Sequence, residues 1–180
     1  MSPRPEVDAA PDRSRAIGAV LDRFGTRALA IAGRAGIRIV ALERAERYRD
    51  RSRALRRLAA AVDDWPVPPA GLFVVEERTV YLRSLSMMTI AHEFAHAIDC
   101  ALGDGCYVSG RDPRIRRAFV SARRFVTPYA ASALDEYFAE SLRAFVGVND
   151  PRSPWPRATR LRLRAIDPTM ESILAALLSS

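Results

Sequence analysis

Lysine is absent from this chain of 180 residues, so all 28 of its basic side chains are arginine. They outnumber the 21 acidic side chains and give a formal net charge of +7. A charge of this sign favours acidic partners through long-range attraction. Because no recognisable nucleic-acid-reading element accompanies it, a nucleic-acid partner is not expected. The Arg-rich segment 152–164, which contains Trp155, is expected to be a solvated face.

Cysteine and long apolar runs are also scarce. The two cysteines, Cys100 and Cys106, are too few for a disulfide framework. A single local bridge between them stays open, although free thiols are favoured in a chain with no secretion signal. No apolar run is long enough for a membrane-spanning helix, and charged residues interrupt the first thirty positions. We therefore expect no transmembrane segment and no signal peptide, as in a cytoplasmic protein or one exported without a visible leader.

Apolar periodicity and breaker residues divide the chain into helices and strands. Helical spacing predicts helices over residues 15–34, 44–62, 86–102, 113–126, 132–147 and 168–177. Short apolar runs predict strands over residues 37–42, 72–75 and 79–82, the last two forming a hairpin. Ser132 is expected to cap the helix that follows it. This mixture predicts an α+β protein with an N-terminal helical segment, residues 1–36, and one domain, residues 37–180.

Histidine is nearly absent, and both copies lie in one motif. His92-Glu93-Phe94-Ala95-His96 is an H-E-x-x-H sequence on a predicted helix, so the two imidazoles, four residues apart, share a face and can hold one metal ion. The Glu93 carboxylate can reach a metal-bound water without being a ligand, which suits a general base. Two unrelated histidines on one helix are the alternative, but the concentration of both in this motif argues against it.

A catalytic zinc ion needs a third protein ligand and one open position. The ligand cannot be another histidine, and the longer motif with a third histidine would place it at Leu102. The acidic stretch Asp135–Glu140 offers Glu136 as the ligand. Glu140, one turn further along, can accept a hydrogen bond from a ligating imidazole. The alternative is an ordinary acidic helix start with a solvated Glu140.

Two sequence blocks carry a family resemblance. His92–Asp99, followed by Tyr129-Ala130-Ala131 and Glu136–Glu140 (E-Y-F-A-E), resembles the catalytic domain of anthrax lethal factor and its relatives, which include the Pro-Pro endopeptidases. The Mlc titration factor group is similar more distantly. The resemblance spans about residues 37 to 178, although only the two blocks are specific.

The resemblance implies one zinc ion held by His92, His96 and Glu136, with Glu93 as the base. It also implies that Tyr129 stabilises the transition state, although a tyrosine in such a loop is otherwise more often a packing residue.

Asp99 stands three residues after His96. A hydrogen bond to an imidazole and an ordinary polar contact are both open for its carboxylate.

Together these features predict an α+β zincin-like metallopeptidase domain, in which a small twisted sheet packs on the H-E-x-x-H helix. We expect a metalloendopeptidase that acts on a peptide or protein substrate, bound along an edge strand near residues 79–84. One alternative is a zinc-binding regulatory or protein-interaction module with little peptidase activity. Another is a nucleic-acid-binding protein with a structural zinc site, which would need Cys100 or Cys106 as a fourth ligand.

Overall fold

The computed structural model describes residues 3–58, 61–151 and 157–178. Its four strands form one mixed sheet in the order β1-β2-β4-β3. Their bounds are Glu6–Asp8 (β1), Arg38–Ala41 (β2), Gly71–Val74 (β3) and Thr79–Leu82 (β4). β1, β2 and β4 run parallel, and β3 is antiparallel to β4. The α+β class is confirmed, as are the predicted hairpin and the strand at residues 38–41.

The predicted edge strand is wrong. β4 is an internal strand between β2 and β3, and all four of its residues are buried. The free edges of the sheet belong to β1 and β3. Strand order depends on the crossover that brings β4 beside β2, and local apolar alternation carries no signal for that pairing.

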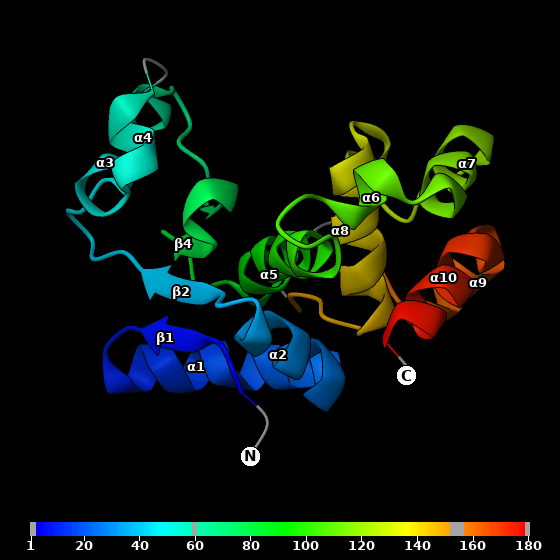
Figure 1. Cartoon of the computed structure of the whole chain (residues 1–180), viewed down its shortest axis with the longest axis horizontal. Coiled ribbons are helices and arrows are strands. Elements are labelled where there is room, and N and C mark those ends of the chain that lie inside the picture. The colour runs from blue at the N-terminus through cyan, green and yellow to red at the C-terminus, as the bar shows by residue number, and fades with distance from the viewer. Residues whose placement is uncertain (1–2, 59–60, 152–156, 179–180) are drawn as a thin grey trace.

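The helices up to residue 102 flank this sheet, and those that follow lie farther from it (Figure 1). Their bounds are Pro11–Leu21 (α1), Gly25–Arg34 (α2), Tyr48–Arg51 (α3), Arg53–Arg57 (α4), Met87–Leu102 (α5), Val108–Arg111 (α6), Pro113–Ser121 (α7), Leu134–Phe145 (α8), Arg160–Ile166 (α9) and Pro168–Leu178 (α10). The predicted helices at residues 86–102 and 168–177 are confirmed as α5 and α10. No helix within the described residues is long and apolar enough to cross a membrane.

The N-terminal segment differs from its prediction in two ways. Residues 6–8 form β1, a strand too short to leave an apolar pattern, and it pairs with β2. The single helix predicted over residues 15–34 is divided into α1 and α2, because Gly25 adopts a φ of +81° that ends a right-handed helix. The division of the chain at residue 36 stays a prediction, but side chains from α1 and α2 belong to the same buried cluster as those of α5.

The helix predicted over residues 44–62 is wrong. Two short helices, α3 and α4, stand there, and Ser52 between them has an extended backbone and caps α4 through its hydroxyl. The Asp63 carboxylate accepts hydrogen bonds from the backbone of Tyr48 and Arg49, and the Tyr48 hydroxyl donates to the Pro69 carbonyl at 2.6 Å. These long-range bonds replace the continuous helix that the local sequence favours.

Two other helix boundaries also differ. α7 ends at Ser121 rather than Val126, and Phe125 in the following loop packs against Phe119 and Tyr137. Ser132 does not cap α8, because its hydroxyl donates to the Tyr129 carbonyl at 2.7 Å.

The Arg-rich segment forms α9 in its described part. Arg160, Arg162 and Arg164 are exposed there, while Leu163 is buried. Trp155 lies outside the described residues.

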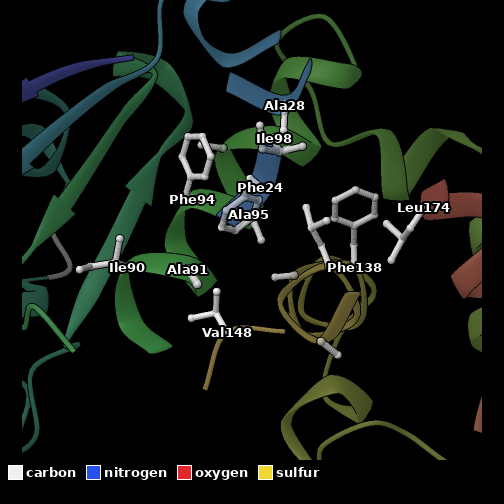
Figure 2. Packing of buried hydrophobic residues seen from close by; sticks show 14 of the residues in the cluster. Phe24, Ala28, Ile90, Ala91, Phe94, Ala95, Ile98, Phe138, Val148 and Leu174 are labelled. Carbon is white, nitrogen blue, oxygen red and sulfur yellow. The ribbon is translucent and has the colours of Figure 1, made fainter. Parts of the chain in front are cut away.

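The core is built around α5. Figure 1 shows α5 in the middle of the molecule, with the sheet, α1 and α2 on one side and α8 on the other. Phe94 of α5 is fully buried and meets Phe24 edge-to-face, with ring centroids 4.9 Å apart. Figure 2 shows Phe24 and Ala28 from the N-terminal segment beside this helix, Phe138 of α8 on another side of it, and Leu174 of α10 beyond Phe138. The metal-motif helix is therefore fixed from several directions.

We predict that Phe24→Ala lowers the free energy of unfolding of the whole chain by about 3–5 kcal/mol, because it leaves a cavity against Phe94. Chemical denaturation followed by far-UV circular dichroism measures this, and one cooperative transition is expected. Val120→Ala is the control, since Val120 is 83% exposed and its truncation should change stability by less than about 0.5 kcal/mol. If Phe24→Ala instead shifts only a small transition at low denaturant concentration, residues 1–36 unfold separately from the rest of the chain.

Candidate metal centre

α5 carries the H-E-x-x-H motif, and the apolar face of this helix is buried. The Ser86 hydroxyl caps the helix by accepting a hydrogen bond from the Thr89 backbone at 3.1 Å. Apolar side chains such as Ile90 and Phe94 face the core. His92 and His96 lie toward α8, as the four-residue spacing predicts, and Glu93 lies against β3.

Three side chains converge at this face. The Nε2 atoms of His92 and His96 are 3.2 Å apart, and the Glu136 Oε2 atom lies 3.1 Å from the first and 3.4 Å from the second. This buried carboxylate oxygen makes no well-formed hydrogen bond with any described residue, despite those short distances. The three residues form a cluster that could hold one metal ion.

The chemistry of these atoms fits a cation. Nδ1 of His92 lies against the Glu140 carboxylate, so Nε2 is the nitrogen that can coordinate a metal ion once it has lost its proton. Burial disfavours the charged imidazole, but Glu136 and Glu140 outweigh it and raise the pKa of His92 to about 10. Burial also opposes ionisation of Glu136, yet the two histidines lower the pKa of that carboxyl to about 2. The field at the cluster therefore favours positive charge between the ligand atoms.

Glu140 makes the contact expected of it. Its Oε1 atom lies 3.0 Å from Nδ1 of His92. Arg143, a fully buried guanidinium, donates to both carboxylate oxygens, from Nε at 2.9 Å and from Nη2 at 2.8 Å. The Thr127 hydroxyl donates to Oε2 at 2.7 Å. Burial raises the pKa of Glu140, but the opposite effect of His92 and Arg143 is larger. The pKa is therefore lowered overall, and the carboxylate stays charged. Sequence reasoning missed Arg143 and Thr127, although Arg143 stands one helical turn after Glu140.

Glu93 occupies a different position from the ligands. Its carboxyl is partly buried, and burial raises its pKa, while the two histidines and a backbone hydrogen bond from Phe73 act in the opposite direction. It also packs against β3, since a Cβ atom added at Gly71 would lie 2.6 Å from its Cγ. A side chain held beside the edge strand, with a raised pKa, suits an acceptor that later returns its proton.

Tyr129 lies at the rim of the same site. Its hydroxyl donates to Oε1 of Glu136 at 3.0 Å, and its ring lies 5.5 Å from the ring of His92. Burial and the nearby Glu136 charge raise the pKa of Tyr129 to about 12, so the hydroxyl keeps its proton at neutral pH. The side chain is 55% exposed and can meet a bound molecule.

Asp99 serves another part of the fold. It accepts hydrogen bonds from the backbone and the hydroxyl of Ser109, at 2.8 and 2.6 Å, and so ties α6 to α5. Burial raises the pKa of Asp99 to about 6, although Ser109 partly offsets the effect. Nδ1 of His96 is buried and has no hydrogen-bond partner among the described residues, so the polar contact of Asp99 is with α6 and not with the imidazole.

A cavity of about 510 Å³ opens beside the cluster. Its walls are mostly apolar and come from the start of β3, the first turns of α5, the loop before α8, and α8 and α9. Lining residues include Gly71, Met88, Glu93, Val126, Tyr129 and Arg162. The site therefore joins a metal-binding donor set to a space that can receive a ligand. Cys100 and Cys106 are both free thiols and lie outside the donor set.

The fold has a solved counterpart. The structure of the Pro-Pro endopeptidase PPEP-2 from Paenibacillus alvei matches 94% of this chain and 93% of its own chain, with a TM-score of 0.66 and 18% sequence identity. No protein-family model and no curated protein matches the sequence. The zincin-like fold expected from the sequence blocks is thereby confirmed.

We predict that the purified protein holds about one zinc ion per chain and that His96→Ala and Glu136→Ala each lose most of it, because two remaining ligands bind zinc weakly. Metal analysis after dialysis against a weak chelator measures the loss. Glu93→Gln is the matched control and should retain its zinc. Full zinc content in Glu136→Ala would assign the third ligand to another carboxylate.

For Glu140→Gln we predict two separable effects. Zinc affinity should fall by roughly tenfold to a hundredfold, because the amide holds the His92 imidazole less firmly than the carboxylate does. Stability of the metal-free protein should fall by about 3–5 kcal/mol, because the buried Arg143 charge loses its partner. Competition with a chromophoric chelator and urea denaturation measure the two effects. Unchanged zinc affinity would show that Glu140 does not hold the His92 imidazole in place for zinc.

Proposed function

We propose that this protein is a zinc-dependent metalloendopeptidase. The observation that carries the proposal is the convergence of His92, His96 and Glu136 beside Glu93, which is not a member of the cluster and lines the cavity. Catalytic zinc sites use three protein ligands and leave one position open, whereas structural sites are closed by four. The described residues supply three, which supports a catalytic zinc site over a structural one.

The residues then divide the chemistry of peptide hydrolysis. When bound, zinc supplies a water of lowered pKa and a Lewis acid for the scissile carbonyl. Glu93 takes the proton of the attacking water and delivers it to the leaving amine, a role that its raised pKa supports. Tyr129 donates a hydrogen bond from its hydroxyl to the oxyanion as that charge develops. Its hydroxyl has to leave Glu136 for the substrate, and the exposure of the side chain allows this rotation.

An extended peptide would bind along β3. This strand has a free edge, and its first residue, Gly71, lines the cavity next to Glu93. Backbone hydrogen bonds to an edge strand bind a peptide without regard to its sequence, while a cavity selects side chains. The similar solved structure is that of a Pro-Pro endopeptidase. Peptides with consecutive prolines are therefore the first to test on this chain.

A peptide library tests the proposal directly. We predict that the zinc-loaded protein cleaves a subset of the library and that Glu93→Gln, with its zinc retained, lowers turnover by at least about a hundredfold, because the proton acceptor is gone. Mass spectrometry of the products identifies the cleaved bonds. A zinc-loaded parent that binds peptides but cleaves none would favour the regulatory or protein-interaction module.

Tyr129→Phe isolates the second role. We predict that this change lowers kcat by roughly a hundredfold or more, the loss that follows from removing one oxyanion donor, while zinc content and KM change little. The phenyl ring preserves the packing against His92. Steady-state kinetics on any cleaved peptide measure the effect. Turnover within about threefold of the parent, worth less than about 1 kcal/mol, would reduce Tyr129 to a packing residue.

A further inference from the structure

The Thr127 hydroxyl joins the backbone of the Tyr129 loop to the carboxylate that contacts His92. Thr127 donates from Oγ1 to Oε2 of Glu140 at 2.7 Å and accepts from the Ala130 backbone at 3.2 Å. After Pro128, residues Tyr129–Ala131 form a single turn of 3-10 helix. The hydroxyl thus connects the backbone beside Tyr129 to the carboxylate that holds His92.

The Glu140 carboxylate, which accepts from the Thr127 hydroxyl, has hydrogen-bond donors at both oxygens. Each oxygen of Glu140 accepts two hydrogen bonds: Oε1 from His92 and from Nε of Arg143, and Oε2 from Thr127 and from Nη2 of Arg143. A buried carboxylate with four donors has little freedom to rotate, because any rotation leaves a donor without a partner. Glu140 is therefore a rigid point to which both His92 and the Tyr129 loop are attached.

A polar contact joins Tyr129 directly to the cluster, from its hydroxyl to Oε1 of Glu136 at 3.0 Å, and the proposed reaction has to break it. The Tyr129 side chain is half-exposed, and its carbonyl accepts from the Ser132 hydroxyl within the same loop. Once the hydroxyl has left Glu136, neither the exposure of the side chain nor the Ser132 contact sets the distance between the phenol and the metal cluster. The contact from Thr127 to Glu140 does, because it joins the loop to α8 at the residue that also orients a ligand.

We propose that Thr127 is a positioning residue, which holds the loop of Tyr129 where the phenol hydroxyl, after it leaves Glu136, can reach the oxyanion. This inference rests on the proposed peptidase function. It predicts that removal of the Thr127 hydroxyl acts on turnover through Tyr129, and not through the metal or through substrate binding. Small displacements of a catalytic donor have large effects on rate.

Thr127→Val removes the hydroxyl and keeps the branched shape. We expect kcat to fall on the order of ten- to a hundredfold, with KM and zinc content near those of the parent. Thr127→Ser keeps the hydroxyl and should restore most of the rate. The matched control is Thr159→Val, since the Thr159 hydroxyl likewise accepts from a backbone N–H, that of Arg162 at 3.1 Å, but contacts neither Glu140 nor Tyr129.

A double-mutant cycle with Tyr129→Phe separates positioning from a general structural effect. If Thr127 acts through the phenol, Thr127→Val combined with Tyr129→Phe is no slower than Tyr129→Phe alone, within about twofold. Multiplicative losses in the double variant, or a Thr127→Val rate within about twofold of the parent, overturn the proposal. So does an equal loss of kcat in Thr159→Val.

A measurement that does not depend on peptidase activity tests the role of Thr127 separately from the proposed function. Amide hydrogen exchange at Ala130, followed by NMR in the zinc-loaded protein, should accelerate at least about tenfold in Thr127→Val and stay near the parent rate in Thr127→Ser. Unchanged exchange in Thr127→Val shows that the loop is not held by this hydroxyl and overturns the inference, whatever the peptidase activity. If Ala130 exchanges faster in Thr127→Val but the zinc-loaded parent cleaves no peptide, the loop restraint stands, while the proposed function and the role of Thr127 in turnover are overturned.

Discussion

The carboxylate of Glu140 is the group on which the site depends. It is buried between α8, which carries it, and α5, which carries His92, and its charge is balanced by the buried Arg143. A buried charge is tolerated only when it is paired and fully hydrogen-bonded, and here four donors meet that condition. The same bonds fix the imidazole that would ligate zinc and the loop that carries Tyr129. Stability and the geometry of the metal cluster therefore have one physical origin.

The parts of this arrangement that were predictable from sequence are set by local periodicity. Four-residue spacing on a helix places His92 and His96 on one face whatever the rest of the fold does, and a carboxylate pair one turn apart places Glu136 and Glu140 together in the same way. The contact between these faces of α5 and α8 was predictable from chemistry. A catalytic zinc site with two histidines needs a third ligand, and the carboxylates of α8 supply one. α5 and the β3–β4 hairpin were equally predictable, because each has a regular apolar pattern in the sequence with clear ends.

The parts that were not predictable depend on contacts between distant residues. Three-residue β1 owes its existence to pairing with β2, and the division between α3 and α4 follows from the Asp63 carboxylate, which accepts from the backbone of residues 48 and 49. The placement of β3 rather than β4 at the edge comes from sheet topology, which moves the proposed peptide-binding strand to the one that packs on Glu93. Arg143 and Thr127 resemble ordinary surface residues in the sequence until folding brings them to Glu140.

Zinc-edge anomalous diffraction from crystals of the zinc-loaded protein tests the central claim most directly. The account predicts one strong peak bonded to His92, His96 and Glu136 at about 2.0–2.2 Å, with a fourth position open to water and to the cavity beside β3. A peak closed by a fourth protein ligand, or a peak elsewhere with these three side chains unliganded, would contradict a catalytic zinc site.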